Sequence, residues 1–286
     1  MARAFNAATS QYLQVNSAPV TATPLTLACW FKPNDITGVY SLLGIGASGT
    51  LNQWNLFARG SIGDSKIGAQ AYAVSTNAIA STTIAYSAGV WQHACAVFVS
   101  STERNAYLNG GSKGSNTTSC APATPDQSRI AARGMSSLQQ YLDGEIAESA
   151  VWNVALSDAE IAALAKGFSP LLIRPENLVA YWPLIRDTDQ DVVGVFNMTA
   201  FNTPTIADHP PKMLYPSRPF HPSFSVGGVT YTATAAAQAL LKGTISVVRA
   251  AQAMLKKTLA GSAAGQAMLE KVIGATAAGQ ALLEKI

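Results

Sequence analysis

The side chains best suited to acid–base catalysis are two glutamates near the middle of the chain, Glu145 and Glu148. Retaining glycoside hydrolysis needs two carboxyl groups about 5–5.5 Å apart. Residues i and i+2 of one strand meet that need because they face the same side. Glu145 and Glu148 are three positions apart, so on a strand they face opposite sides. We therefore expect both to be exposed or ion-paired surface carboxylates, and we predict no catalytic residue and no enzymatic activity.

The three histidines do not form a recognisable metal or catalytic motif. His93 is the only one within the strand-rich part of the chain, and no Gly-x-Ser-x-Gly nucleophile motif accompanies it. His209 and His221 lie among prolines, without the spacing of zinc ligands. We predict a structural role for His93, packed beside Trp91, and we predict no metal site and no cofactor.

The three cysteines, Cys29, Cys95 and Cys120, are odd in number and lack Cys-x-x-Cys spacing. This pattern excludes a recognisable zinc or redox motif. Cys29 and Cys95 lie in apolar, strand-like runs, so we expect both to be buried and reduced rather than joined in a disulfide.

Charge limits the class of partner that the chain binds. The 19 basic and 16 acidic residues give a net charge of +3, and charged residues make up only 12% of the chain. Phosphate neutralisation needs clustered cations, so nucleic acid is not an expected partner. We also expect no secretion signal, since the N-terminus lacks an apolar core, and no membrane span, since no apolar run reaches about 18 residues. The low charge density favours a surface that is partly covered by partner proteins.

The elements that position these side chains are expected to be short strands. Strand-like runs separated by turn residues repeat along the chain up to about residue 200. Runs at this spacing without intervening helices predict a mainly β protein, an antiparallel two-sheet jelly-roll sandwich. One short helix interrupts the pattern, where Ser157 and Glu160 form a capping box and Gly167 provides the stop. The residues expected in its core are Trp30, Trp91, Val97, Phe98, Trp152 and Trp182.

The composition divides the chain into three regions. Residues 1–206 carry the strand pattern. Five prolines within 208–222 predict a stiff, extended linker over residues 207–230. Residues 231–286 are rich in alanine, with no aromatic residue after Tyr231, and cannot build an ordinary globular core. We expect this last region to be an α-helical appendage.

A repeat of 14 residues runs through this appendage, and 14 residues are two heptads. Apolar residues and one glutamine per repeat form a stripe with steps of three and four, which predicts a coiled coil that joins identical chains. Glycines within the repeat, each costing about 1 kcal/mol in a helix interior, leave open the alternative of several short helices. The residues predicted to form the oligomer are Leu241, Ile245, Gln252, Leu255, Leu259, Gln266, Leu269, Ile273, Gln280 and Leu283.

Several segments follow the order and spacing of one known family. The run from Leu25 to Pro33 and the Trp91-Gln-His strand are similar to early strands of that family. Residues 141–148 and 151–157 are similar to its late Gly-x-Ile, Trp and Ala-Leu-Ser segment. Residues 3–206 therefore resemble laminin-G-like, concanavalin A-like jelly-roll domains, in the version that tailed bacteriophages and prophages encode.

The resemblance implies a binding or structural module, because the glycosidases of this fold carry a Glu-x-Asp-x-Glu run that the chain lacks. We hypothesise a non-enzymatic virion structural protein, a capsid decoration or a head- or tail-fibre component, assembled in the host cytoplasm. Its expected partners are its own copies, as a homotrimer because phage fibres are often trimers, and other virion proteins. The alternative is a soluble carbohydrate-binding lectin module, and a glycoside hydrolase comes third.

Two further expectations concern ligands. Calcium occurs on the loops of some family members, and its candidate ligands here are not localised by any EF-hand spacing. Aromatic and polar side chains on a jelly-roll face stack on and bond to sugars, although Trp and Tyr in strands are more often core. The calcium candidates are Asp35, Asp64, Asp126 and Asp143. The carbohydrate candidates are Trp54, Arg59, Tyr72 and Tyr141.

Overall fold

The computed structural model divides the chain into two compact units, Met1–Pro216 and Ser217–Ile286. In the second unit the described residues form one hairpin, made of β18 (Ser223–Val226) and β19 (Val229–Thr232). The residues described are 2–62, 64–134, 138–185, 189–210, 213–215, 223–226 and 229–232.

Tyr231 and Thr232, the first two residues of the predicted helical appendage, belong to strand β19 instead. The rest of the appendage lies outside the described residues, so its helicity and its oligomer stay predictions. The same holds for the residues proposed to form its stripe. They are Leu241, Ile245, Gln252, Leu255, Leu259, Gln266, Leu269, Ile273, Gln280 and Leu283.

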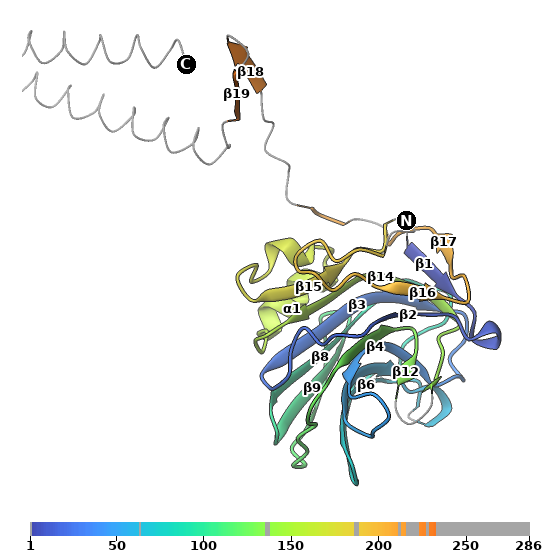
Figure 1. The fold of residues 1–286 in the computed structure, drawn as a ribbon. Helices are drawn as coiled ribbons and strands as arrows, with labels where there is room; N and C mark the ends of the chain where they lie inside the picture. Colours follow the sequence, from blue (N-terminus) through green and yellow to red (C-terminus); the bar gives the residue numbers. More distant parts are fainter. Residues whose placement is uncertain are drawn as a thin grey trace, which may run out of the picture. The chain divides into compact units, whose positions relative to one another are not determined.

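The first unit is a sandwich of two antiparallel sheets (Figure 1). This arrangement confirms the predicted mainly β jelly-roll fold. The eight-stranded sheet follows the order β10-β9-β8-β3-β14-β1-β17, with β15 also paired to β14. Its strands are β1 (Ala2–Phe5), β3 (Leu25–Pro33), β8 (Gln92–Ser100), β9 (Glu103–Leu108), β10 (Gly111–Asn116), β14 (Gly144–Trp152), β15 (Leu178–Trp182) and β17 (Thr205–Ala207).

The seven-stranded sheet follows the order β16-β2-β11-β4-β5-β6-β7. A short separate hairpin, made of β12 and β13, lies against β4 and β11 of this sheet. The strands are β2 (Tyr12–Val15), β4 (Tyr40–Gly46), β5 (Gln53–Ala58), β6 (Ile67–Ala73), β7 (Thr76–Ser81), β11 (Gln127–Ile130), β12 (Arg133–Gly134), β13 (Leu138–Gln139) and β16 (Thr199–Phe201).

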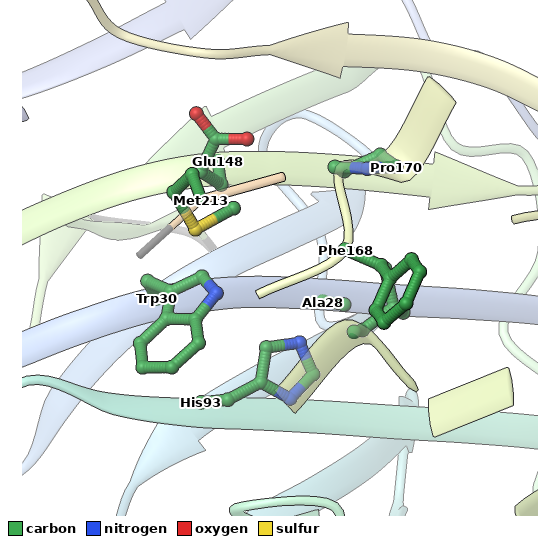
Figure 2. Close-up of a pocket in the computed structure, with 8 residues that line it drawn as sticks. Ala28, Trp30, His93, Glu148, Phe168, Pro170 and Met213 are labelled. Atoms are coloured by element: carbon green, nitrogen blue, oxygen red, sulfur yellow. The ribbon is translucent and has the colours of Figure 1, made fainter. Parts of the chain in front are cut away.

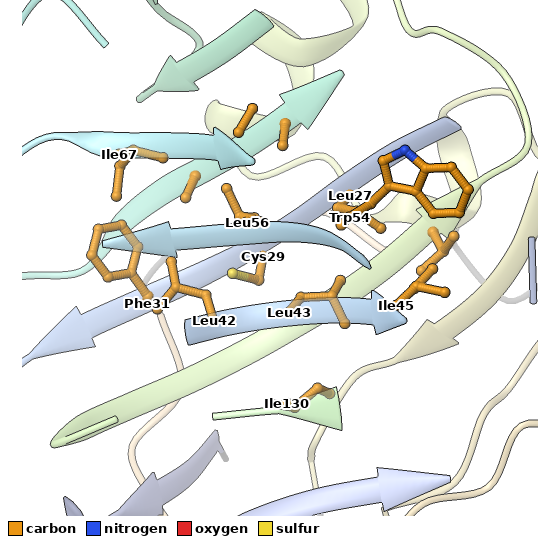
Figure 3. Close-up of a cluster of buried hydrophobic side chains, with 14 of the residues drawn as sticks. Leu27, Cys29, Phe31, Leu42, Leu43, Ile45, Trp54, Leu56, Ile67 and Ile130 are labelled. Carbon is orange, nitrogen blue, oxygen red and sulfur yellow. The ribbon is translucent and has the colours of Figure 1, made fainter. Parts of the chain in front are cut away.

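The main core lies between the two sheets and follows the alternation of strand side chains. In β3, Leu27, Cys29 and Phe31 are completely buried, and in β5, Trp54 and Leu56 join them (Figure 3). Burying one such large side chain contributes about 1.5–3 kcal/mol. The alternate residues of both strands therefore face away from the core and form the outward face of each sheet.

Four of the six predicted core residues are buried, and the two others are half-buried. Trp30 is half-buried because it is an alternate residue of β3 and points outward, whereas Trp91 precedes β8. The buried residues are Val97, Phe98, Trp152 and Trp182. The half-buried residues are Trp30 and Trp91.

A second apolar cluster covers the outward face of the eight-stranded sheet. Helix α1 (Asp158–Ala165) buries Ile161 and Leu164 there, beside Trp152. The predicted capping box at Ser157 and Glu160 is present at the start of this helix. Three short 3-10 helices complete the unit, η1 (Ala7–Thr9), η2 (Gly60–Ile62) and η3 (Pro170–Leu172).

Part of the predicted proline-rich linker belongs to the first unit. The backbone N–H of Leu214 donates to the Gly167 carbonyl at 2.6 Å, and the Ser169 N–H donates to the Leu214 carbonyl at 2.9 Å. The described residues of this segment, 208–210 and 213–215, are called the strap below. The first unit extends to Pro216, beyond the boundary of 206 expected from composition.

In the part of the chain that the structure describes, no helix is long and apolar enough to cross a membrane.

Candidate functional site

The two glutamates weighed for catalysis occupy different environments. Glu145 lies opposite Lys32 on the neighbouring strand, and the Lys32 Nζ donates to its carboxylate at 3.1 Å. Glu145 is therefore the ion-paired carboxylate that the sequence predicts. For Glu148 the prediction was wrong, because its side chain is buried. The strand register shifts between Ala147 and Ala150, and Glu148 sits in this bulge with a φ of +55°.

Glu148 binds the strap to the sandwich. Its Oε1 accepts hydrogen bonds from the Tyr215 hydroxyl at 2.7 Å and pairs with the His209 Nε2 at 2.9 Å. Its Oε2 accepts from the Tyr181 hydroxyl on β15. A buried carboxylate needs such partners because burying an unpaired charge is very costly. The strap supplies two of them, which explains why it belongs to the first unit rather than to a linker.

A small pocket lies beneath the strap, on the outward face of the eight-stranded sheet (Figure 2). His93 and Trp30 form its floor, with their rings edge to face at 5.6 Å, and Met213 and Glu148 lie on the side of the strap. Burial lowers the pKa of His93 to about 3, and its Nδ1 has no hydrogen-bond partner. His93 thus packs against Trp30 rather than Trp91. The pocket has room for about one water molecule, so it is not a substrate site.

The outward face of the seven-stranded sheet is rich in amides. In β5 the core takes Trp54 and Leu56, so Gln53 and Asn55 face outward. Gln70 of β6 accepts from the Gln53 Nε2 at 3.2 Å and donates to Asn77 at 2.8 Å, which extends a hydrogen-bonded chain across β5, β6 and β7. Gln53, Asn55 and Gln70 are buried, whereas Asn77 is exposed.

Aromatic rings gather on the same face, at its other side. The rings of Tyr12 and Phe201 stack in parallel with centroids 4.6 Å apart, and the Tyr141 ring lies 6.0 Å from that of Tyr12. Tyr12 is nearly buried, while Phe201 is 36% exposed and Tyr141 is half-buried. With their polar neighbours these rings form what we call the aromatic–arginine patch. Its members are Tyr12, Gln14, Gln127, Arg129, Tyr141 and Phe201.

Arg129 is the centre of the patch. Its Nε donates to the Gln14 Oε1 at 2.7 Å, and a second guanidinium nitrogen donates to the Gln127 Oε1. Burial lowers the pKa of Arg129, while Tyr12, Asp126 and Tyr141 act in the opposite direction. Burial also raises the pKa of Tyr12. The patch therefore combines a partly desolvated cation, amides and accessible rings.

The β12–β13 hairpin borders the patch with a second arginine. A Cβ added to Gly134 would lie 1.5 Å from a guanidinium nitrogen of Arg129, so the Arg129 side chain lies directly against the hairpin backbone. Arg133, the residue before this glycine, donates to the Gln139 Oε1 at 3.2 Å. Its Nε is buried without a partner, and burial lowers its pKa while Tyr72 acts in the opposite direction.

The four predicted carbohydrate residues do not lie together. Trp54 is 2% exposed within the main core, so its ring has no free face for a sugar. Arg59 is half-buried and donates to the Ser81 hydroxyl and, at 3.3 Å, to the Ile62 carbonyl. Tyr72 is half-buried on β6, on the Arg133 side of the outward face. Only Tyr141 belongs to the aromatic–arginine patch.

Sequence reasoning missed the remaining members of the patch, although a signal for them was present. Tyr12 and Gln14 are alternate residues of one short strand, as are Gln127 and Arg129 of another. Alternate residues share a face. The pairing of Gln14 with Arg129 then joins the two strands, and this pairing is a tertiary fact.

The four aspartates considered for calcium have separate partners. Asp35 accepts from Thr37, Gly38 and Tyr40 within its own loop. Among the described residues no group of three or more His, Cys, Asp or Glu side chains could hold a metal ion. Asp64 pairs with Lys66, Asp126 accepts from the Ser48 hydroxyl, and Asp143 accepts from the Asn34 amide.

The comparisons with known proteins identify the family. Residues 7–162 match the family described as the concanavalin A-like lectin/glucanases superfamily. The chain belongs to this superfamily. The match confirms the laminin-G-like resemblance over those residues, whereas a phage origin stays a prediction. No curated protein sequence matches the chain.

Several solved structures resemble the chain in fold. A candidate carbohydrate binding protein from Bacteroides ovatus ATCC 8483 has a TM-score of 0.55 and 18% identity, over 71% of this chain and 58% of that one. A heptameric SAP-like pentraxin from Limulus polyphemus has a TM-score of 0.43 and 17% identity, over 54% and 75%. The CBM40 of a Ruminococcus gnavus IT-sialidase, bound to α2,3-sialyllactose, has a TM-score of 0.43 and 15% identity, over 51% and 84%. At these identities the likeness concerns the fold alone.

Proposed function

We propose that the sandwich is a non-enzymatic carbohydrate-binding module and that the aromatic–arginine patch is its site. The observation that carries this proposal is the combination of half-exposed rings with amide side chains on one outward sheet face. Sugar rings stack their C–H faces on aromatic rings, and their hydroxyls bond to amide donors and acceptors. Tyr141 and Phe201 supply the rings, and Gln14 and Gln127 supply the amides.

The positions of the two middle glutamates support a binding role without hydrolysis. Glycoside hydrolysis requires two carboxyl groups that reach the same bond. Glu145 is paired with Lys32, and Glu148 is enclosed by Tyr181 and the strap on the other sheet. Neither carboxylate belongs to the aromatic–arginine patch.

Binding by the full chain to a glycan array, followed by calorimetry on the best ligand, tests this proposal. Phe201→Ala should weaken that binding about five- to tenfold or more, because a central interface ring contributes above 1 kcal/mol. Phe168→Ala is a matched control, since Phe168 is 37% exposed and Phe201 is 36% exposed, and Phe168 lines the pocket of the other sheet. Equal losses in both variants, or no glycan bound at all, would contradict the proposal.

The virion role stays a second proposal, supported by the resemblance to phage-encoded domains and by the 14-residue repeat. In this proposal residues 231–286 join three copies and the sandwich is displayed on the particle. Sedimentation of the full chain beside a chain ending at Ser225 tests the oligomer. A trimer that becomes a monomer on truncation supports it, and two monomers contradict it.

A further inference from the structure

We infer that the aromatic–arginine patch binds an acidic saccharide and that Arg129 binds its carboxylate. This inference rests on the proposed function and adds the class of ligand. It begins from the charge of Arg129, whose hydrogen-bond partners among the described residues are the neutral side chains of Gln14 and Gln127. Within the described ranges no carboxylate lies at ion-pair distance from it.

Three other arginines of the sandwich differ from Arg129 in their partners or in their burial. Arg3 is buried, and it donates to both oxygens of Asp189, at 2.8 and 2.5 Å. Arg174 pairs with Glu160. Arg104 also lacks a carboxylate, but it is completely buried, so no ligand reaches it. Arg129 is half-buried and accessible, and it has no ion-pair partner among the described residues.

Asp126, the carboxylate that acts on the pKa of Arg129, is already hydrogen-bonded to another residue. Asp126 raises the pKa of Arg129, yet its two oxygens accept from the Ser48 N–H and the Ser48 hydroxyl, both at 2.7 Å. Desolvation of the guanidinium is thus opposed only in part by the protein's own charges. A carboxylate arriving with a ligand would complete this compensation.

Arg133 adds a second cation to the same face. It precedes Gly134, whose backbone contacts the Arg129 guanidinium, and its Nε is buried without an acceptor. A buried Nε is out of a ligand's reach, so Arg133 contributes to this face through its positive charge. Two neighbouring guanidiniums, bonded within the described ranges to neutral amides, therefore favour an anion over a neutral ligand.

The geometry of the guanidinium and the neighbouring aromatic rings favour a ligand that carries a carboxylate on a sugar. A guanidinium presents two parallel N–H groups that match the two oxygens of a carboxylate. The Tyr141 side chain acts on the pKa of Arg129, and the Tyr141 ring lies 6.0 Å from that of Tyr12, on which Phe201 stacks. A ligand bound to Arg129 can therefore stack its sugar ring on an aromatic ring of the same patch. A uronic or sialic acid residue combines both groups, whereas inorganic phosphate lacks the ring.

The experiment compares acidic oligosaccharides with their carboxyl-reduced forms, using the full chain and calorimetry. Oligogalacturonate, a hyaluronan oligosaccharide and sialyllactose are the probes, and a sulfated neutral oligosaccharide and inorganic phosphate are added. We expect a preference of about tenfold or more for the carboxylated form over its reduced form, since hydrogen bonds to a charged group are strong. Stronger binding to the sulfated sugar or to phosphate would overturn the carboxylate assignment.

Two variants test the role of Arg129. Arg129→Gln should lose about tenfold or more in affinity for the acidic probe and little for its reduced form, while Arg129→Lys should keep part of the preference. Arg174→Gln, on the α1 side, is the matched control and should change neither. If Arg129→Gln does not fold, the Arg129→Lys variant and the reduced probes still decide the matter.

The outcomes separate this inference from the proposed function. Equal binding of acidic and reduced probes, with Arg129→Lys indistinguishable from the wild type, overturns the acidic ligand and leaves a neutral carbohydrate module. No binding of any glycan overturns both.

Discussion

In both sheets, strand residues alternate between the core and an outward face. The two outward faces differ in how far other segments of the chain cover them. On the eight-stranded sheet, α1, η3 and the strap cover the alternate residues of β3, β8 and β14. On the seven-stranded sheet, amides, arginines and rings occupy the alternate residues, and several remain accessible. The chain thus encloses one face with its own segments and leaves polar and aromatic side chains partly accessible on the other.

The comparison shows how similar residue types acquire different roles. Glu148, His93 and Tyr181 are polar groups of the eight-stranded sheet, and all are buried. Glu148 and Tyr181 are hydrogen-bonded within the chain, and His93 packs against Trp30, so all three belong to the packing of the covered face. Arg129 and Tyr141 of the other face keep accessible surface, which is why the proposed ligand site lies there. Burial, rather than residue type, distinguishes the two sets of polar side chains.

The largest expected effect is on the covered face. Trp152 is completely buried against α1, and its Nε1 donates to the Ile173 carbonyl at 2.8 Å. Trp152→Ala should lower the free energy of unfolding by about 3–5 kcal/mol, because it leaves a cavity and an unpaired carbonyl. Urea denaturation of the full chain measures the change. A loss below about 1 kcal/mol would show that the covering of this face is not a packed core.

The pH dependence of stability tests the buried state of His93. Its pKa of about 3 in the folded chain lies below the value of about 6.5 for an unfolded histidine. Protonation therefore favours the unfolded state, so stability is complete above pH 6.5 and falls toward pH 3. The slope is about 1.4 kcal/mol per pH unit, which is about 3 kcal/mol between pH 6.5 and pH 4.

Other groups also titrate in this range, so the measurement compares the wild type with His93→Leu. Their difference in unfolding free energy should change by about 3 kcal/mol over that interval. The other side chains that line the pocket of His93 are the same in both proteins. Parallel pH profiles would show that His93 is hydrated in the folded chain.

Glu148→Gln tests the anchoring of the strap by a carboxylate that the sequence analysis expected at the surface. An amide cannot accept from Tyr181, Tyr215 and His209 together, so we expect a loss of about 1–3 kcal/mol. Glu145→Gln is the matched control, since the Glu145 ion pair lies nearer the surface and such pairs contribute about 0–1 kcal/mol. Limited proteolysis should also cut the Glu148→Gln variant sooner near the strap. Equal stability of the two variants would contradict the anchoring role.

The smallest expected effect is on the uncovered face. Arg129→Gln should change the unfolding free energy by less than about 1 kcal/mol. Among the described residues Arg129 is hydrogen-bonded to neutral amides and has no ion-pair partner, so the substitution breaks no ion pair there. The same denaturation assay measures it. A loss comparable to that of Trp152→Ala would place Arg129 in the stability of the fold and would remove the contrast between the faces.

Much of the fold could be predicted from local patterns. The runs at 25–31 and 91–99 became β3 and β8 within one or two residues, and the capping box at Ser157 began α1. Such signals depend on neighbours in the chain, namely alternation and capping, and these act before any long-range contact. The sequence did not bring the members of the proposed site together, since only Tyr141 of the four carbohydrate candidates lies in the aromatic–arginine patch.

The sequence by itself determined the strand alternation, the class of the fold and the family, because each depends on the order of residue types along the chain. Only the tertiary structure decided which alternate residues face a partner and which face solvent. The bulge at Glu148 turned a residue expected at the surface into a buried anchor for the strap. The pairing of β2 with β11 brought Gln14 to Arg129 across more than a hundred residues of chain. These decisions depend on register and on burial between distant segments, which no local pattern specifies.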